Sequence, residues 1–134
     1  MNELRLNELH DIELNSKGHI NRFFSASSVS ERVRQICLCL LKTNEGECFV
    51  NGLHGIPWFE KPASRLSSRQ SGQAGILGTP STHLDVVGKI LEDKLNALED
   101  VKKVKKIKLK TDGRNLSGRV QIICNNDELT EVDF

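Results

Sequence analysis

The chain has 134 residues, of which 37% are hydrophobic and 28% charged, and its formal net charge is +1. This length predicts one domain over residues 1–134 that buries roughly two thirds of the surface of the unfolded chain. The near-neutral charge gives no indication of nucleic acid or a membrane as a partner, no apolar run reaches the ~20 residues that span a bilayer, and the first residues do not resemble a signal peptide.

Residues 11–24 have the pattern of a β-hairpin. Ile12 and Leu14 alternate with polar neighbours, and Ile20 continues the alternation further along the chain. Between them a Ser-Lys-Gly turn ends at Gly18, and a glycine there can adopt a positive φ. The segment therefore predicts two short strands before the first helix.

Residues 28–42 have the periodicity of an amphipathic helix. Ser28 is the predicted N-cap, and Glu31, three residues later, completes a capping box. The residues on the predicted buried face are Val33, Ile36, Cys37, Leu40 and Leu41. Their spacing of three and four residues is typical of one helix face packed on a core. Arg32 and Arg34 lie off this face, and we expect both to be solvated.

The connection after this helix has an unusual composition. Its sequence over residues 46–59, GECFVNGLHGIPWF, contains three glycines, a proline, the only tryptophan and two of the five phenylalanines. Two interpretations stay open, a plug for the core or a surface for another protein, and for Trp58 we favour the second. Residues 60–82 are rich in Ser, Gly, Gln and Arg, which predicts a long exposed loop at about 60–80.

Residues 83–98 are predicted to form the second helix. Thr82 is the expected N-cap, and Asp85 follows it at the capping-box spacing. The apolar stripe consists of Leu84, Val87, Leu91, Leu95 and Leu98. Gly88 interrupts the helix at a cost of about 1 kcal/mol relative to alanine, and we expect close packing against a neighbour to be the reason.

The C-terminal third alternates between apolar and polar residues, as β-strands do. Strands are predicted at residues 104–111, 118–124 and 129–134, with turns at 112–115 and 125–127 and with Leu116 to Gly118 as part of the connection. The element order predicts an α+β fold, in which a small antiparallel sheet carries two main helices on one face and ends in a β-meander.

The sequence contains no catalytic constellation. It lacks the phosphate-binding, zinc-protease and nucleophile-elbow motifs, and its four histidines are scattered. The four cysteines, Cys37, Cys39, Cys48 and Cys124, form no C-x-x-C pair, so reduced thiols in a protein assembled in a cytosol are favoured over zinc or disulfides. We expect no enzyme activity, no cofactor, no metal and no small-molecule substrate.

Two features point to other function classes. Glu45 and Glu47 lie two residues apart, and paired carboxylates can hydrolyse glycosides, which suggests a peptidoglycan-cleaving, lysozyme-like enzyme as one alternative. Residues 102–110 contain six lysines, which a nucleic-acid-binding accessory protein would use on phosphates. The same lysines alternate with apolar residues, so the run is also typical of a half-buried strand with a solvated face or of a protein-docking strand.

Five segments, at residues 29–41, 43–47, 49–58, 76–78 and 101–104, together resemble a known family. They read V-x-E-R-V-R-Q-I-x-x-x-L-L, T-x-x-G-E, an aromatic followed by G-I-P-[YW], I-L-G, and V-x-x-V before the final strands. In this order they resemble the small baseplate wedge proteins of contractile-tailed phages, which include the baseplate assembly protein W type, the sheath initiators and relatives in type VI secretion baseplates.

The chain departs from this family in two places. Residues 60–75 lengthen a link that is usually short. Some relatives carry an E-P-R motif after the second helix, where this chain reads LEDVKKV and only Glu99 or Asp100 stands near the acidic position. The proline and the arginine are absent, so the contact that this motif makes is not carried over.

The resemblance implies a structural component of the virion at the junction of baseplate wedge and tail sheath around the tube. Its partners would be the tail sheath protein, baseplate wedge proteins and tail tube or hub proteins, with six copies expected in each baseplate. It would offer a strand-exchange docking site that initiates sheath assembly by β-augmentation.

The same resemblance implies two sets of partner-binding residues. Those expected to contact the baseplate or tube are Glu47, Gly55, Ile56, Pro57, Trp58, Glu99 and Asp100. Those expected to dock the sheath strand are Leu129, Thr130, Glu131, Val132, Asp133 and Phe134.

Overall fold

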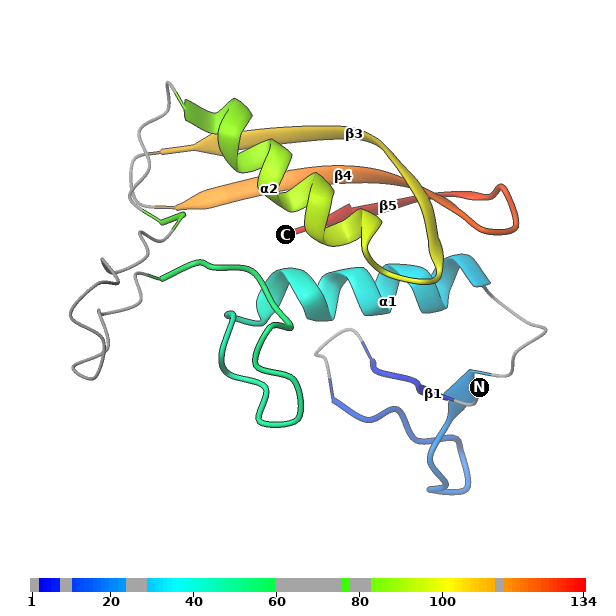
Figure 1. The fold of residues 1–134 in the computed structure, drawn as a ribbon. Helices are drawn as coiled ribbons and strands as arrows, with labels where there is room; N and C mark the ends of the chain where they lie inside the picture. Colours follow the sequence, from blue (N-terminus) through cyan, green and yellow to red (C-terminus); the bar gives the residue numbers. More distant parts are fainter. Residues whose placement is uncertain (1–2, 8–10, 24–28, 60–75, 78–82, 113–114) are drawn as a thin grey trace.

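The computed structural model describes residues 3–7, 11–23, 29–59, 76–77, 83–112 and 115–134. Its elements in chain order are β1 (Glu3–Leu4), β2 (Arg22–Phe23), α1 (Val29–Lys42), α2 (Leu84–Asn96), β3 (Val101–Thr111), β4 (Leu116–Cys124) and β5 (Leu129–Asp133). The fold is α+β with a C-terminal strand meander, as predicted (Figure 1). The predicted caps Ser28 and Thr82 and most of the exposed loop predicted at about 60–80 lie outside the described residues. Ile76, within that predicted loop, is described and is buried in the core.

The main sheet has three antiparallel strands in the order β3-β4-β5. The β3–β4 register pairs Leu109 with Gly118, and the β4–β5 register pairs Val120 with Val132. Strand β3 begins at Val101, three residues before the prediction, and β4 begins at Leu116. The prediction that Leu116 to Gly118 belong to the connection is therefore wrong.

The early start of β3 was hidden by two irregularities in its pairing with β4. The register shifts between Val101 and Lys103 and again between Val104 and Lys106. Because of these bulges, Val101 and Val104 are both buried although they lie three residues apart. An ideal strand buries every second residue, so a search for that alternation places the start of β3 too late in the sequence.

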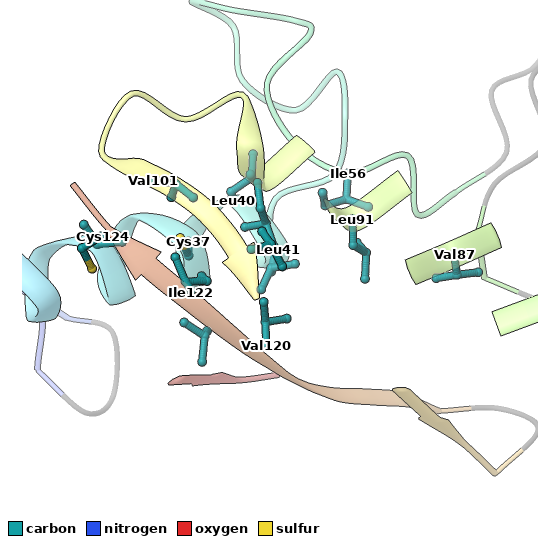
Figure 2. Close-up of a cluster of buried hydrophobic side chains, with 14 of the residues drawn as sticks. Cys37, Leu40, Leu41, Ile56, Val87, Leu91, Val101, Val120, Ile122 and Cys124 are labelled. Atoms are coloured by element: carbon teal, nitrogen blue, oxygen red, sulfur yellow. The ribbon is translucent and has the colours of Figure 1, made fainter. Parts of the chain in front are cut away.

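Both helices cover one face of this sheet. Helix α2 packs on β3, and α1 packs on β5 and β4. Buried side chains from both helices and the sheet fill the space between them (Figure 2), with Val33, Leu91, Val120 and Ile122 all fully buried. All four cysteines are free, and Cys37 and Cys124 are buried in this core. The interpretation of these two thiols as small apolar side chains agrees with their burial.

The centres of the predicted apolar stripes of both helices are confirmed, whereas Ile36, Leu84 and Leu98 are only half-buried and Leu98 lies beyond the end of α2. The expectation that Arg32 is solvated is wrong. Its side chain is only 14% exposed and forms an ion pair with Asp100 at 2.9 Å. The pair joins α1 to the turn before β3, and its two residues are 68 positions apart in the chain, so no local pattern in the sequence indicates it.

Helix α2 contains Gly88, for which close packing was expected. The structure contradicts that expectation, since a Cβ at this position would meet only the Leu109 Cδ1 atom, at 3.8 Å. That is an ordinary van der Waals distance, so the neighbouring packing does not require a glycine here.

The N-terminal segment lies on the side of α1 away from the main sheet (Figure 1). The Gln35 side chain holds it there, because its Oε1 accepts from the Leu6 N–H at 2.9 Å and its Nε2 donates to the Leu4 carbonyl at 2.8 Å. The hairpin predicted at residues 11–24 forms only in part, as a single bridge between Leu14 and Ile20 with Gly18 at a φ of 77° in its turn. Strand β2 pairs instead with β1, and Ile12 bridges Leu6.

Neither described helix has the length and hydrophobicity needed to cross a bilayer.

Candidate functional site

The loop after α1 is held in place by the side chain of Asn44. Its Oδ1 accepts from the backbone N–H of Trp58 at 3.1 Å and of Phe59 at 3.3 Å. The backbone N–H of Asn44 donates to the Glu47 carboxylate at 2.8 Å. A parallel bridge between Asn44 and Ile56 brings the two ends of the loop together. The loop therefore has a fixed base, and the chain between residues 47 and 55 projects from it.

Gly55 allows the two ends of this loop to meet. Its φ is 111°, and a Cβ there would lie 2.8 Å from both the Asn44 carbonyl carbon and the Thr43 carbonyl oxygen. Backbone atoms cannot yield as a side chain can, so only glycine fits. Gly55, Ile56 and Pro57 are all buried. Of the predicted partner-binding residues, these three are buried and support the loop from inside.

Trp58 is half-buried and packs against the core cluster. Its Nε1 donates to the Leu41 carbonyl at 2.8 Å, and its ring centroid lies 6.4 Å from that of Phe134. A tryptophan whose N–H is satisfied in this way and whose ring packs on another aromatic has a clear packing role. The preference for an interface role of Trp58 therefore has no support in these contacts.

The apolar residues that do face outward lie at the tip of the loop. Phe49 is 99% exposed, Val50 78% and Leu53 76%. Phe59, at the base, is also exposed. Three neighbouring large apolar side chains on a fixed loop are typical of a protein-binding surface. The sequence indicated the loop through its composition, but it did not show which aromatics point outward.

The predicted acidic partner-binding residues lie in two separate places. Glu47 belongs to the loop at the C-terminal end of α1, whereas Asp100 pairs with Arg32 in the second turn of this helix. Glu99 is exposed, and its backbone carbonyl accepts from Asn125 Nδ2 at 2.8 Å. At 1.5 Å per residue, the turns of α1 that Trp58 and Asp100 contact are about 14 Å apart. The structure does not bring these residues into one patch.

The C-terminal strand β5 lies at one edge of the sheet, as predicted. Gly118 and Phe134 exchange two backbone hydrogen bonds, of 2.9 and 3.0 Å. Since bonded pairs alternate in an antiparallel ladder, the backbone groups of Thr130 and Val132 also face β4. Those of Leu129, Glu131 and Asp133 therefore face the other edge, with which no strand of the described chain pairs.

The side chains of β5 divide in the same alternating way. Thr130 and Val132 are buried under α1, and Phe134 packs on Trp58. Glu131 and Asp133 are exposed on the far face, where Gln121 Nε2 donates to Glu131 at 2.6 Å and Arg119 Nε donates to Asp133 at 2.7 Å. The hydrogen bond from Arg119 lowers the pKa of the Asp133 carboxyl. Of the six predicted strand-docking residues, only Leu129, Glu131 and Asp133 are thus exposed.

The carboxylates proposed for glycoside hydrolysis are both engaged. Glu45 is largely buried and pairs with Lys94 Nζ at 3.0 Å, and Glu47 accepts from the Asn44 N–H. The described residues contain no group of three or more potential metal ligands. Lys102, at the start of the lysine run, pairs with Asp127.

Comparisons with protein-family models and with curated proteins find no match for this chain.

Proposed function

We propose that this protein is a structural component of a contractile phage tail, at the junction of baseplate wedge and sheath, where its sheet edge starts sheath assembly. The five segments that resemble baseplate wedge proteins support this proposal. The structural observation that carries the proposal is the free edge of β5. The side chains of β5 that face the helices are buried in the core, whereas its backbone groups on the free edge have no strand partner among the described residues.

An edge strand of this kind binds partners by β-augmentation, in which backbone hydrogen bonds supply the contact and alternate side chains set the register. Unprotected edges also invite aggregation, so proteins shorten or charge them. Strand β5 has five residues and carries Glu131 and Asp133 on its exposed face. Its length and charge favour pairing with one chosen strand over pairing with any exposed edge.

The experiment that tests the proposal measures binding of the full chain to the tail sheath protein of the same phage. Glu131→Pro removes an N–H that faces the free edge, while the bonds from β5 to β4 remain. We expect sheath binding to weaken at least tenfold. Glu131→Ala is the matched control, because it removes the same carboxylate but keeps the N–H, and it should bind nearly as the parent chain does.

Circular dichroism melts of both variants check that the fold is intact. Equal sheath binding by Glu131→Pro and Glu131→Ala, with both variants folded, would rule out β5 as the docking strand.

The loop tip is proposed as the contact with baseplate wedge proteins. Truncating large apolar side chains at the centre of an interface often costs 2 kcal/mol or more in binding. We therefore expect Phe49→Ser with Leu53→Ser to weaken wedge binding about thirtyfold. Val86→Ser, at a 54% exposed apolar residue on α2, is the control and should bind normally. Unchanged binding by the loop variant would place the wedge contact elsewhere.

A further inference from the structure

The opposite edge of the sheet carries a groove that the proposed sheath contact does not use. It has a volume of about 450 Å³, and the described residues that line it belong to α2 and β3. Leu84, Gly88 and Glu92, four residues apart, form one wall, and Ile107 with Leu109 forms part of the other. The helix and the strand edge thus enclose a channel that runs along the strand.

The backbone of β3 is unpaired along this channel. Because residues 118, 120 and 122 of β4 bond to β5, the alternate residues 117, 119 and 121 bond to β3, where they pair with Lys110, Lys108 and Lys106. The N–H and C=O groups of Ile107 and Leu109 therefore point toward the free edge. Within the described residues, no strand lies beside this edge.

One end of the edge is already closed by the protein itself. Asn96, the last residue of α2, accepts from the Val104 N–H through its Oδ1 at 3.0 Å. This bond takes the place of a strand partner at Val104. The unpaired edge starts after that point, at Lys105, and runs past Leu109, which is room for a partner strand of about five residues.

The charges around the groove select the side chains of such a strand. On the sheet face away from the helices, Lys106, Lys108 and Lys110 are exposed in a row beside the free edge. On the helix side, Asp85 and Glu92 stand on the wall together with Lys89, which pairs with Glu92, and the strand side of the groove includes Lys105 and Lys106. A strand in the groove would therefore favour carboxylates on its outer face and uncharged, small apolar side chains on its inner face.

We propose that this groove binds an extended segment of a partner protein in which carboxylates alternate with small apolar residues. The segment adds to the sheet as a fourth strand beside β3, with its apolar side chains against α2. Gly88 gives these side chains room, because among the described residues only a Leu109 methyl lies within 4 Å of its Cβ position. This inference concerns a different edge from β5 and is independent of the phage-tail proposal.

The lysine row also bears on the identity of the occupant. Two β3 edges would place like charges side by side, which opposes pairing between copies of this chain at β3. Strand β5 of a second copy has carboxylates, but Glu131 and Asp133 already accept hydrogen bonds from Gln121 and Arg119. The partner is therefore a different chain with carboxylates still free to pair.

The test uses the full chain and a capped nine-residue peptide of alternating valine and aspartate, at low salt. A two-dimensional amide NMR titration should give saturable shifts at Ile107, Leu109 and Gly88. Peptides N-methylated on only the valines or only the aspartates locate the backbone bonds. One of the two should lose binding and the other should keep it, because alternate amides of a strand face opposite edges.

Variants of the lysines on β3 test the role of charge in peptide binding, and variants of Gly88 test the need for free volume in the groove. The double variant Lys108→Glu with Lys110→Glu should bind the valine–aspartate peptide at least tenfold more weakly. It should instead bind a valine–lysine peptide more tightly than the parent chain does. Lys17→Glu with Lys103→Glu changes the net charge equally, at exposed residues outside the groove, and is the matched control. Gly88→Leu should fill the channel and abolish binding, whereas Gly88→Ala should keep it.

Four results would overturn the proposal. These are no saturable binding of the peptide, shifts confined to β5, equal loss of binding for both N-methylated peptides, and concentration-dependent shifts at Ile107 and Leu109 without peptide. The last would assign the groove to a second copy of the chain.

Discussion

Gly55 and Gly46 illustrate two reasons why a loop can require glycine, a positive φ and a close approach of other backbone atoms. Both have a positive φ, of 111° and 97°, but only Gly55 lies against backbone atoms. Replacing Gly46 by alanine should cost about 1 kcal/mol in the free energy of unfolding, from the left-handed conformation alone. Gly55→Ala should cost more than about 2 kcal/mol, because the Cβ also displaces Thr43 and Asn44.

Urea unfolding of both variants measures this difference. Gly52→Ala is the control, since its Cβ would meet no atom within 4 Å and its φ is not positive. A Gly55→Ala cost no larger than that of Gly46→Ala would mean that the loop base can shift to accept a side chain.

Because of the buried thiol of Cys37, we expect the stability of the protein to fall as the pH becomes alkaline. Burial, with smaller contributions from Cys124 and Asp100, raises the pKa of its thiol from 9.0 to about 12. The folded state thus holds the proton more tightly than the unfolded state. The contribution of the protonated Cys37 thiol to the free energy of unfolding is fully present below pH 9. It is lost as the pH rises toward 12, by about 1.4 kcal/mol per pH unit.

The measurement compares the parent chain with Cys37→Ala by urea unfolding at pH 7 and pH 10, in reducing buffer. The alanine variant loses packing at both values but cannot titrate at this position. We expect the stability advantage of the parent chain to shrink by about 1.4 kcal/mol between the two pH values. A constant advantage would show that the buried thiol does not govern the alkaline limit.

At the scale of elements, Gly88 is a weakness of α2 that the fold does not require. An interior glycine costs a helix about 1 kcal/mol relative to alanine, and the only atom near its Cβ position is at van der Waals distance. Gly88→Ala should therefore raise the free energy of unfolding by about 0.5–1 kcal/mol. Thermal melts by circular dichroism check this, and a destabilised variant would show that α2 packs more tightly on β3 there.

The elements show which features a sequence can predict. The stripe of Val87, Leu91 and Leu95 was predicted because helical periodicity is local and follows from burial of one face. The start of β3 was missed because two bulges break the alternation of a regular strand. Arg32 was expected in solvent because its partner, Asp100, comes close only through the packing of α1 against the turn after α2.

The candidate site was predicted less well than the elements, for the same reason. Glycines and aromatics indicated a special loop, and a terminal strand indicated a sheet edge. Whether Trp58 or Phe49 faces outward depends on distant contacts, with the Leu41 carbonyl and Phe134 for Trp58. The groove depends on α2 and β3 lying side by side, which no local pattern describes.

At the scale of the whole molecule, β5 both completes the core and forms an edge. Val132 is fully buried and Thr130 is 9% exposed, while Phe134 closes the core against Trp58. A chain that ends at Asn126 would lose these side chains and would expose Val120 and Ile122 on β4, which β5 borders. We expect this truncated chain to lose the cooperative unfolding transition rather than to lose only partner binding.

Thermal unfolding followed by circular dichroism, together with the emission of the single tryptophan, tests this expectation. The parent chain should unfold cooperatively with Trp58 leaving its contact with Phe134, and the truncated chain should show the emission of a solvated tryptophan at all temperatures. Phe134→Ala separates the aromatic contact from the strand, because it should shift the emission and lower the stability by about 3 kcal/mol or less while the transition remains. A truncated chain with a cooperative melt would mean that α1, α2, β3 and β4 suffice for the fold, and that β5 serves docking alone.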